Sequence, residues 1–235
     1  AACRQWANSL VRAKLLRQRR TLQHWLQQRP DARKPLWDAL QALPPLLAQL
    51  PGNGDNGSAL PAIASLRGIE GAAARAYFGG LAGVMPPALG FGGRNRRPPR
   101  DPVNAGLSLG YTLLHMLALQ SSQAAGLDPL LGFYHRPAFG RESLACDLIE
   151  PLRPAVDLWL WELLRQRRLT ADHFRQDKGA CLLGKSGRAI FYAEWEKSSQ
   201  PLRRWLRLVC QTLARQLRQA GSVWLEAGDE LDDLA

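Results

Sequence analysis

The sequence predicts an all-α, multi-helix domain with one small β-hairpin near residues 181–192. Apolar residues recur at helical spacing over several long stretches, and clusters of proline and glycine separate these stretches. A chain of 235 residues, 46% of them hydrophobic, is large enough to bury a substantial core. Because it contains no uninterrupted apolar run of about 18 residues, we expect no membrane span.

The charge balance favours a polyanionic partner. Lys and Arg number 31 against 20 Asp and Glu, for a formal net charge of +11. Arginine dominates the excess, and its guanidinium makes bidentate contacts with phosphate, so nucleic acid is favoured over a membrane surface. The four cysteines are scattered without a CxxC pair. They indicate a reducing, cytoplasmic location and neither a zinc site nor a disulfide framework.

The first 60 residues predict two helices and a loop. Residues 1–28 read as a helix that Pro30 ends, and residues 36–43 as a second helix that stops at Pro44-Pro45, with room for a short helical piece before Pro51. The Gly- and Asn-rich stretch 52–58 predicts a flexible loop. The first helix has candidate buried positions at Trp6, Leu10, Leu15, Leu22, Trp25 and Leu26. Its other faces carry Arg4, Arg12, Lys14, Arg17, Arg19 and Arg20, and either solvent or phosphate could face them.

A third helix is predicted over residues 61–82, and Glu70 falls on its apolar stripe where a leucine is expected. A carboxylate at such a position must be protonated, paired with a cation or bound to a metal. Taken alone, Glu70 fits a structural salt bridge as the simpler interpretation.

Residues 83–101 predict a loop rich in Gly, Pro and Arg, which cannot build a core. Its arginines, Arg94, Arg96, Arg97 and Arg100, could contact phosphates or simply face solvent. A helix over residues 102–125 follows, with Asp101 as its N-cap and Pro102 in its first turn. Asn104 and His115 are polar exceptions on this helix, and His115 fits a hydrogen-bonded boundary position better than a ligand.

Asp147 and Glu150 stand three residues apart in an apolar run, so on a helix both carboxylates share one face. They repel each other unless a cation lies between them, although a solvated acidic face is the simpler alternative. His135 follows a turn a few residues upstream. Pro151 and Pro154 should kink the helix just after Glu150, before it resumes through Leu164.

The remaining sequence predicts a hairpin turning at residues 184–187, a helix over residues 201–220, and an acidic mobile tail over residues 221–235. Gly179 to Ser186 satisfies the letters of the P-loop pattern GxxxxGK[ST]. We do not expect a nucleotide site, because the surrounding residues look like a turn and a strand and not like a strand that leads into a long helix.

Several segments together resemble the spacer-acquisition integrase family of CRISPR-associated (Cas) proteins, over about residues 1–215. The segments are Gly68-Ile69-Glu70-Gly71 through Phe78, Arg94 with Arg97-Pro98-Pro99, Asp101 to Asn104, Gly126 to Pro129, Gly132-Phe133-Tyr134-His135, and Ser143 through Pro154. The resemblance implies a helical catalytic domain that joins prespacer 3′-hydroxyl ends to the CRISPR repeat by metal-assisted transesterification. Besides prespacer and repeat DNA, the resemblance implies two protein partners: a second copy of the chain and a small ferredoxin-like Cas protein.

The resemblance also implies roles for individual residues. Glu70, His135 and Glu150 match metal ligands of the family, and Asp147 matches a further acidic residue beside them, so these four form the expected catalytic set. Carboxylate and imidazole ligands suit Mg²⁺ or Mn²⁺. The expected DNA-binding set is Arg75, Arg94, Arg96, Arg97, Arg100 and Asn104.

The family's N-terminal β domain is absent from this sequence. We therefore expect a truncation or a fusion, for example to an upstream reverse transcriptase. Two other functions stay open: a repair or junction nuclease that uses the same metal site, and a non-catalytic basic DNA-binding scaffold.

Overall fold

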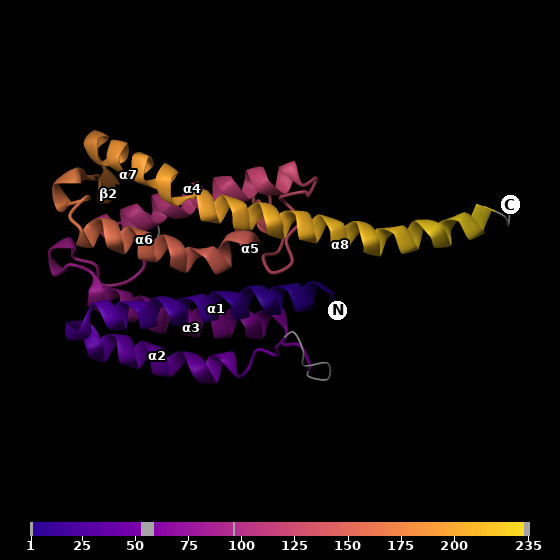
Figure 1. The fold of residues 1–235 in the computed structure, drawn as a ribbon, viewed down its shortest axis with the longest axis horizontal. Coiled ribbons are helices and arrows are strands. Elements are labelled where there is room, and N and C mark those ends of the chain that lie inside the picture. The colour runs from indigo at the N-terminus through magenta and orange to yellow at the C-terminus, as the bar shows by residue number, and fades with distance from the viewer. Residues whose placement is uncertain (1, 53–58, 96, 233–235) are drawn as a thin grey trace.

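Helices running roughly along one long axis make up most of the protein (Figure 1). The structure is a computed structural model that describes residues 2–52, 59–95 and 97–232. The helices are α1 (Ala2–Gln28), α2 (Arg33–Leu47), α3 (Ile63–Val84), α4 (Pro102–Ala124), α5 (Ser143–Ile149), α6 (Arg153–Arg165), α7 (Lys185–Ser198) and α8 (Gln200–Asp232). Short 3-10 turns are η1 (Pro30–Ala32), η2 (Pro87–Leu89), η3 (Glu150–Leu152) and η4 (Ala171–His173), and the strands are β1 (Phe174–Asp177) and β2 (Ala180–Leu183). The predicted all-α class is confirmed.

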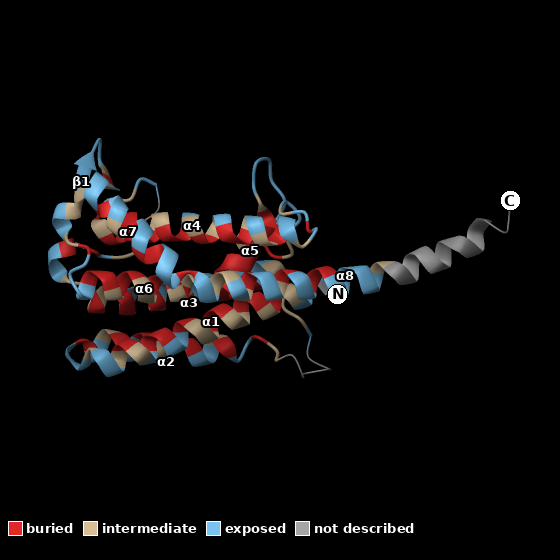
Figure 2. Ribbon diagram, turned by 45° about the horizontal axis from the view of Figure 1, so that its top comes forward, coloured by how far each residue is buried: buried red, intermediate tan, exposed pale blue. Residues whose placement is uncertain are grey.

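Helix α1 is central to the packing. It contacts α2 and α3 on one side and η3 and α6 on the other. The buried faces of these helices are turned toward one another (Figure 2). Gly80 lets α3 come close to its neighbours, since a Cβ there would lie 2.7 Å from Leu22 Cδ2 and 3.1 Å from Ala39 Cβ. Because α1 is shared by both groups of helices, its side chains can reach sites built by either.

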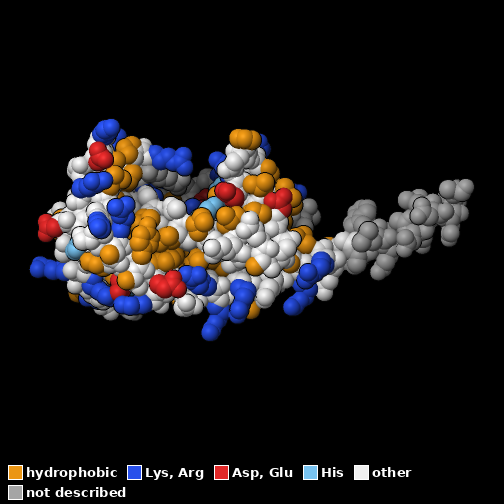
Figure 3. All heavy atoms as spheres, turned by 90° about the horizontal axis from the view of Figure 1, so that it is seen from above, with side chains coloured by type: hydrophobic (Ala, Val, Ile, Leu, Met, Phe, Trp, Pro, Cys, Tyr) orange, Lys and Arg blue, Asp and Glu red, His pale blue; other side chains and the backbone are white. Residues whose placement is uncertain are grey.

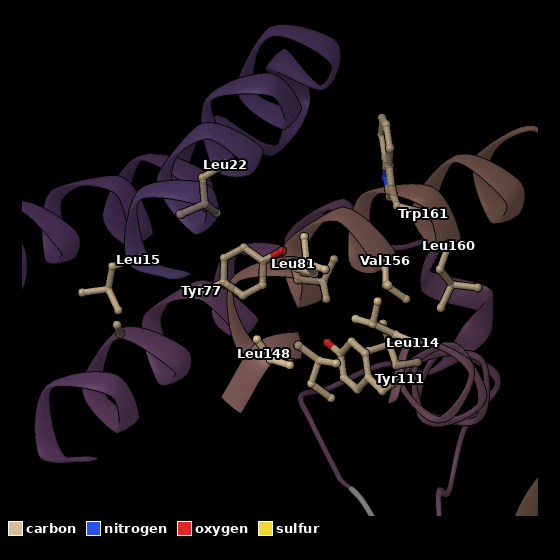
Figure 4. Close-up of a cluster of buried hydrophobic side chains, with 14 of the residues drawn as sticks. Leu15, Leu22, Tyr77, Leu81, Tyr111, Leu114, Leu148, Val156, Leu160 and Trp161 are labelled. Atoms are coloured by element: carbon tan, nitrogen blue, oxygen red, sulfur yellow. The ribbon is translucent and has the colours of Figure 1, made fainter. Parts of the chain in front are cut away.

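The core lies between α1 and α3 on one side and α4 to α6 on the other (Figure 4). Its labelled side chains are Leu15, Leu22, Tyr77, Leu81, Tyr111, Leu114, Leu148, Val156, Leu160 and Trp161, and all are at most 8% exposed. Full burial of a Leu or Val side chain stabilises a fold by about 1.5–3 kcal/mol relative to exposure. This shared core therefore fixes the two groups of helices against each other.

The expected end of the second helix at Pro44-Pro45 is wrong, because α2 continues to Leu47. Leu43 and Leu47 lie one turn apart and are both buried. The main-chain N–H of Ala48 donates to Pro44 O at 2.9 Å, so the last turn keeps its hydrogen bonding despite the prolines. Packing against α3 thus overrides the local helix-breaking signal.

Two predicted helix junctions are confirmed. The Asp101 side chain caps α4 by accepting from Asn104 N at 2.8 Å. The acidic helix breaks at Glu150, where η3 separates α5 from α6. Pro151 lies inside this 3-10 turn, so Glu150 stands at the point where the α-helix is interrupted.

The hairpin exists, but at residues 174–183 and not around Gly184 to Gly187 as predicted. Phe174 pairs with Leu183 and Asp177 with Ala180 in an antiparallel register. The turn is made by Lys178 and Gly179, whose φ values of 48° and 78° are typical of a two-residue hairpin turn. Residues 180–183 of the P-loop-like pattern are therefore strand β2, and Lys185 begins α7, so the pattern forms no phosphate-binding loop.

The final helix extends to Asp232 and does not end at residue 220, so most of the stretch expected to be a tail is helical. Residues 53–58 of the predicted flexible loop, Arg96, and residues 233–235 lie outside the described part of the chain. None of the helices in the described ranges combines the length and apolar character that a membrane crossing requires.

Candidate metal and DNA site

Glu70 and Glu150 meet at the ammonium group of Lys14. Lys14 Nζ, from α1, donates to Glu70 Oε1 on α3 and, at 2.6 Å, to Glu150 Oε2 in η3. The Lys14 and Glu150 side chains are 9% and 8% exposed, whereas that of Glu70 is 21% exposed. Two carboxylates far apart in the sequence thus share one cation at the boundary between the two groups of helices.

Lys14 was placed on the basic, outward face of the first helix, and this placement is wrong. It lies on a buried stripe of α1 together with Ala7, Val11, Gln18, Leu22 and Trp25. These positions follow one another at intervals of three or four residues, so the helical periodicity contained the signal. A lysine on such a stripe, like Glu70 on its own stripe, needs a buried partner of opposite charge.

The pKa values of Lys14 and Glu150 show that both are held in the charged form. Burial alone would raise the pKa of Glu150, but the charges of Lys14 and Arg153 outweigh it and hold this pKa well below its usual range. Burial alone would lower the pKa of Lys14, yet the charges of Glu150 and Glu70 raise it above the ordinary value. Arg153 Nε adds a 2.9 Å bond to Glu150 Oε1, and the Tyr134 hydroxyl donates to Glu70 Oε2.

His135 is fixed by the buried carboxylate of Asp147. Asp147 Oδ1 lies 2.6 Å from His135 Nδ1 and accepts the His135 main-chain N–H at 2.9 Å. Its Oδ2 accepts the main-chain N–H groups of Phe133 and Tyr134 at 2.6 and 2.9 Å. Trp6 of α1 stacks on Phe133 with ring centroids 5.6 Å apart, which ties the same turn to α1. With Nδ1 directed at Asp147, the Nε2 of His135 is the nitrogen left for a ligand or a proton.

The carboxylate pair fits a cation, since the ammonium of Lys14 already lies between the two groups. Its oxygen donors, with an imidazole nearby, are chemically suited to Mg²⁺ or Mn²⁺. Within the described ranges, however, no three His, Cys, Asp or Glu side chains are placed to hold a metal together. Glu70 and Glu150 share Lys14, and His135 follows directly after Tyr134, which contacts Glu70. These described side chains do not form a completed ligand set.

The predicted DNA-binding residues occupy different environments. Arg97 and Arg100 are exposed in the loop before α4, and Arg75 is exposed on α3. Arg94 turns inward, donating to Asn104 Oδ1 at 2.8 Å and to Ser108 Oγ at 3.1 Å. Arg96 lies outside the described residues.

Asn104 is fully buried and supports this loop from within. Its amide donates to Gly93 O at 2.8 Å, and its carbonyl oxygen accepts from Asn95 N at 3.0 Å. In this structure Asn104 therefore holds the loop in place. The hairpin, whose role the sequence did not reveal, supports the loop from the other side, because Cys181 N donates to Pro99 O at 2.7 Å.

A cavity of about 170 Å³ lies beside the carboxylate pair. Its lining includes the basic residues Lys14, Arg67, Arg94 and Arg153, together with Glu70, Tyr77, Tyr111 and Asp157. On the face seen from above, acidic and histidine side chains border a hollow, with Lys and Arg side chains across it (Figure 3). An anionic group entering here would meet several positive charges within reach of Glu70.

Asp157 forms the buried floor of this region. It accepts from Tyr77 OH at 2.8 Å and from Tyr111 OH, whose rings approach from α3 and α4 (Figure 4). Burial raises the pKa of Asp157 to about 6, although the two tyrosine hydrogen bonds and Arg153 act in the opposite direction. The arrangement links both groups of helices directly beneath the candidate site.

Solved structures share this fold. One chain of a structure described as a Cas6-RT-Cas1–Cas2 complex superposes with a TM-score of 0.80 at 26% identity, covering 93% of this chain and 24% of that one. A structure described as a casposase bound to integration product gives a TM-score of 0.72 at 24% identity, over 92% and 62% of the two chains. The second likeness shows the fold alone.

The sequence comparisons agree. A protein of Thermodesulfovibrio yellowstonii named CRISPR-associated endonuclease Cas1 1 is 46% identical over 157 residues, which are 66% of this chain and 49% of that protein. The chain spans about half or less of the length of the curated relatives it matches. The family model described as CRISPR associated protein Cas1 matches residues 1–197. The chain therefore belongs to the CRISPR-associated Cas1 family.

Proposed function

We propose that this chain is the helical catalytic part of a metal-dependent DNA endonuclease and integrase of CRISPR adaptation. The observation that carries the proposal is the meeting of Glu70 and Glu150 around one cation, beside a histidine fixed by Asp147. The basic cavity beside this cluster supports a phosphodiester as the substrate group. Joining a prespacer 3′-hydroxyl to the repeat by transesterification is the reaction expected for the family.

Each residue of the cluster has a separate task in this proposal. Glu70, Glu150 and His135 would hold Mg²⁺ or Mn²⁺, and Asp147 orients His135. Tyr134 fixes Glu70 and Arg153 fixes Glu150, so neither carboxylate is free to rotate away from the site. When bound, the metal supplies charge neutralisation for the phosphodiester during in-line displacement. Arg94 at the cavity wall and the exposed Arg75, Arg97 and Arg100 supply positive charge for the DNA backbone.

The test is strand cleavage and joining on a supercoiled plasmid that carries a CRISPR array, with Mn²⁺ or Mg²⁺ and a labelled duplex. Glu70→Gln and Glu150→Gln should each abolish activity while the fold is retained. The matched control is Glu162→Gln, because Glu162 pairs with Arg165 on α6 outside the cluster. Unchanged activity in both cluster variants would leave a non-catalytic scaffold as the better description.

The products separate the two enzymatic candidates. An integrase transfers the label into the plasmid, whereas a repair or junction nuclease releases only cleaved strands. The assay should include the small Cas2-type partner, since the structural relative described as a Cas6-RT-Cas1–Cas2 complex contains one. We propose DNA, a second copy of this chain and a ferredoxin-like Cas protein as partners, as the family resemblance implies. The same structural relative supports fusion to a reverse transcriptase as one further context.

A further inference from the structure

We infer that Lys14 is a built-in cation that occupies the position between Glu70 and Glu150 and must leave it before a divalent metal can bind. The inference rests on the proposed metal site and adds a residue to it. Lys14 contacts both carboxylates, whereas Tyr134 contacts Glu70 and Arg153 contacts Glu150. The ammonium therefore lies where the two proposed metal ligands converge.

Electrostatics makes the two occupants alternatives. Paired carboxylates in a buried site need a positive charge between them, and the ammonium of Lys14 provides one. A divalent ion interacts more strongly with the same oxygens, but it repels an ammonium a few ångströms away. Both cations cannot occupy the gap between Glu70 and Glu150 together.

The Lys14 side chain has room to move away from the two carboxylates. The cavity of about 170 Å³ beside the carboxylates is lined by Lys14 itself. A lysine has a flexible four-carbon stem, so its ammonium can leave the carboxylates while its backbone stays fixed in α1. Arg153, by contrast, is held over the Tyr111 ring at 4.5 Å and remains on Glu150. Exchange of one cation for another then needs a side-chain movement and no change in the fold.

The first measurement is Mn²⁺ affinity by calorimetry for the parent chain, Lys14→Met and Arg20→Met. Arg20 is an exposed residue of the same helix and controls for the loss of one positive charge. Lys14→Met should bind Mn²⁺ about tenfold more tightly or better, because the competing charge is gone. Arg20→Met should match the parent. Equal or weaker binding by Lys14→Met would overturn the inference.

The second measurement uses the parent chain, because Lys14→Met removes the cation that two largely buried carboxylates share and could fold poorly. The chain has five lysines, so acetylation of each can be followed by mass spectrometry. Without metal, Lys14 should react slowly beside Lys34, whose side chain is 87% exposed against 9% for Lys14. Saturating Mn²⁺ should raise labelling of Lys14 several-fold and leave Lys34 unchanged. Continued protection of Lys14 under those conditions would overturn the inference.

The two proposals fail in different ways. If the parent binds Mn²⁺, Glu70→Gln abolishes binding and Lys14 stays protected, the metal site stands and the role of Lys14 does not. If neither the parent nor Lys14→Met binds Mn²⁺, the metal site itself is wrong and the exchange falls with it. Binding by Lys14→Met but not by the parent would support both.

Discussion

Asp147 holds His135 through two contacts at once, at 2.6 Å to the ring Nδ1 and at 2.9 Å from the main-chain N–H. The same carboxylate closes the turn that precedes the histidine by accepting two further main-chain N–H groups. Asp147 is fully buried. Its carboxylate is in contact with four donor groups, so we propose that it positions His135 and does not itself bind the metal.

Asp147→Asn should weaken Mn²⁺ binding and strand cleavage by about 10- to 100-fold, as expected when the group that orients a histidine ligand is lost. An amide presents only one oxygen, so it also leaves some of the donors around it unpaired. Calorimetry and the plasmid assay measure the two effects. Asp128→Asn is the control, since Asp128 accepts Leu130 N at 2.8 Å on the exposed part of the same loop. Equal losses in the two variants would contradict the role given to Asp147.

The sequence predicted the elements around the site because local rules determine them. The Asp101 cap and the kink after Glu150 follow from proline and from side-chain capping, which act within a few residues. The hairpin was misplaced because its turn uses Lys178 at a positive φ, a conformation that lysine rarely adopts. The extension of α2 past Pro44-Pro45 depends on packing against α3, which no local pattern contains.

The acidic residues and the histidine of the site were predicted as one set, but Lys14 was not part of it. Glu70 on an apolar stripe was recognised as unusual, but Lys14 was counted among the outward arginines of α1, so the partner of Glu70 was missed. Glu70 and Lys14 are 56 positions apart in the sequence, and only tertiary structure joins them. Asn104 was placed in the DNA-binding set along with the arginines, whereas in the structure it is buried and its amide donates to Gly93 O in the basic loop.

Asp157 should make stability fall as the pH rises from about 4 to above 6. Its pKa is raised to about 6 by burial, so between these values the folded chain binds a proton that the unfolded chain has released. The stabilisation is complete below about pH 4 and lost above pH 6, with a span of roughly 3 kcal/mol from the size of the shift. Urea unfolding of Asp157→Asn and the parent at pH 4.5 and pH 7 isolates the effect. The unfolding free energy of the variant, relative to that of the parent, should be higher at pH 7 than at pH 4.5. The same difference in unfolding free energy at both pH values would contradict the prediction.

The exposed arginines of the basic loop should contribute to DNA affinity through phosphate contacts. Arg97→Ala combined with Arg100→Ala should weaken duplex binding and reduce the slope of log K against log salt by about 2, since each phosphate contact releases counterion. Arg215→Ala with Arg218→Ala removes the same charge from exposed positions on α8 and is the control. A salt titration by fluorescence anisotropy measures both. If the two double variants have the same slope, the loop has no special part in binding.

Gly132 should be required for the turn that presents His135. A Cβ at Gly132 would lie 2.8 Å from the main-chain carbon and Cβ of Ser143 and 2.9 Å from Asp147 Oδ2. Gly132→Ala must therefore push the turn away from the carboxylate that anchors it, at a cost of about 1–3 kcal/mol in unfolding free energy. Because the displaced turn carries His135, Mn²⁺ affinity should fall as well.

The control for Gly132→Ala is Gly79→Ala in the interior of α3, where an added Cβ meets nothing within 4 Å. That variant should be stabilised by about 0.5–1 kcal/mol, because alanine loses less conformational freedom than glycine in a helix. Urea unfolding with and without Mn²⁺ compares the two alanine variants directly. Added Mn²⁺ should stabilise Gly79→Ala as much as the parent and stabilise Gly132→Ala far less. An equal metal-dependent gain in both would show that the turn can move without disturbing His135, and the link between Gly132 and the site would be lost.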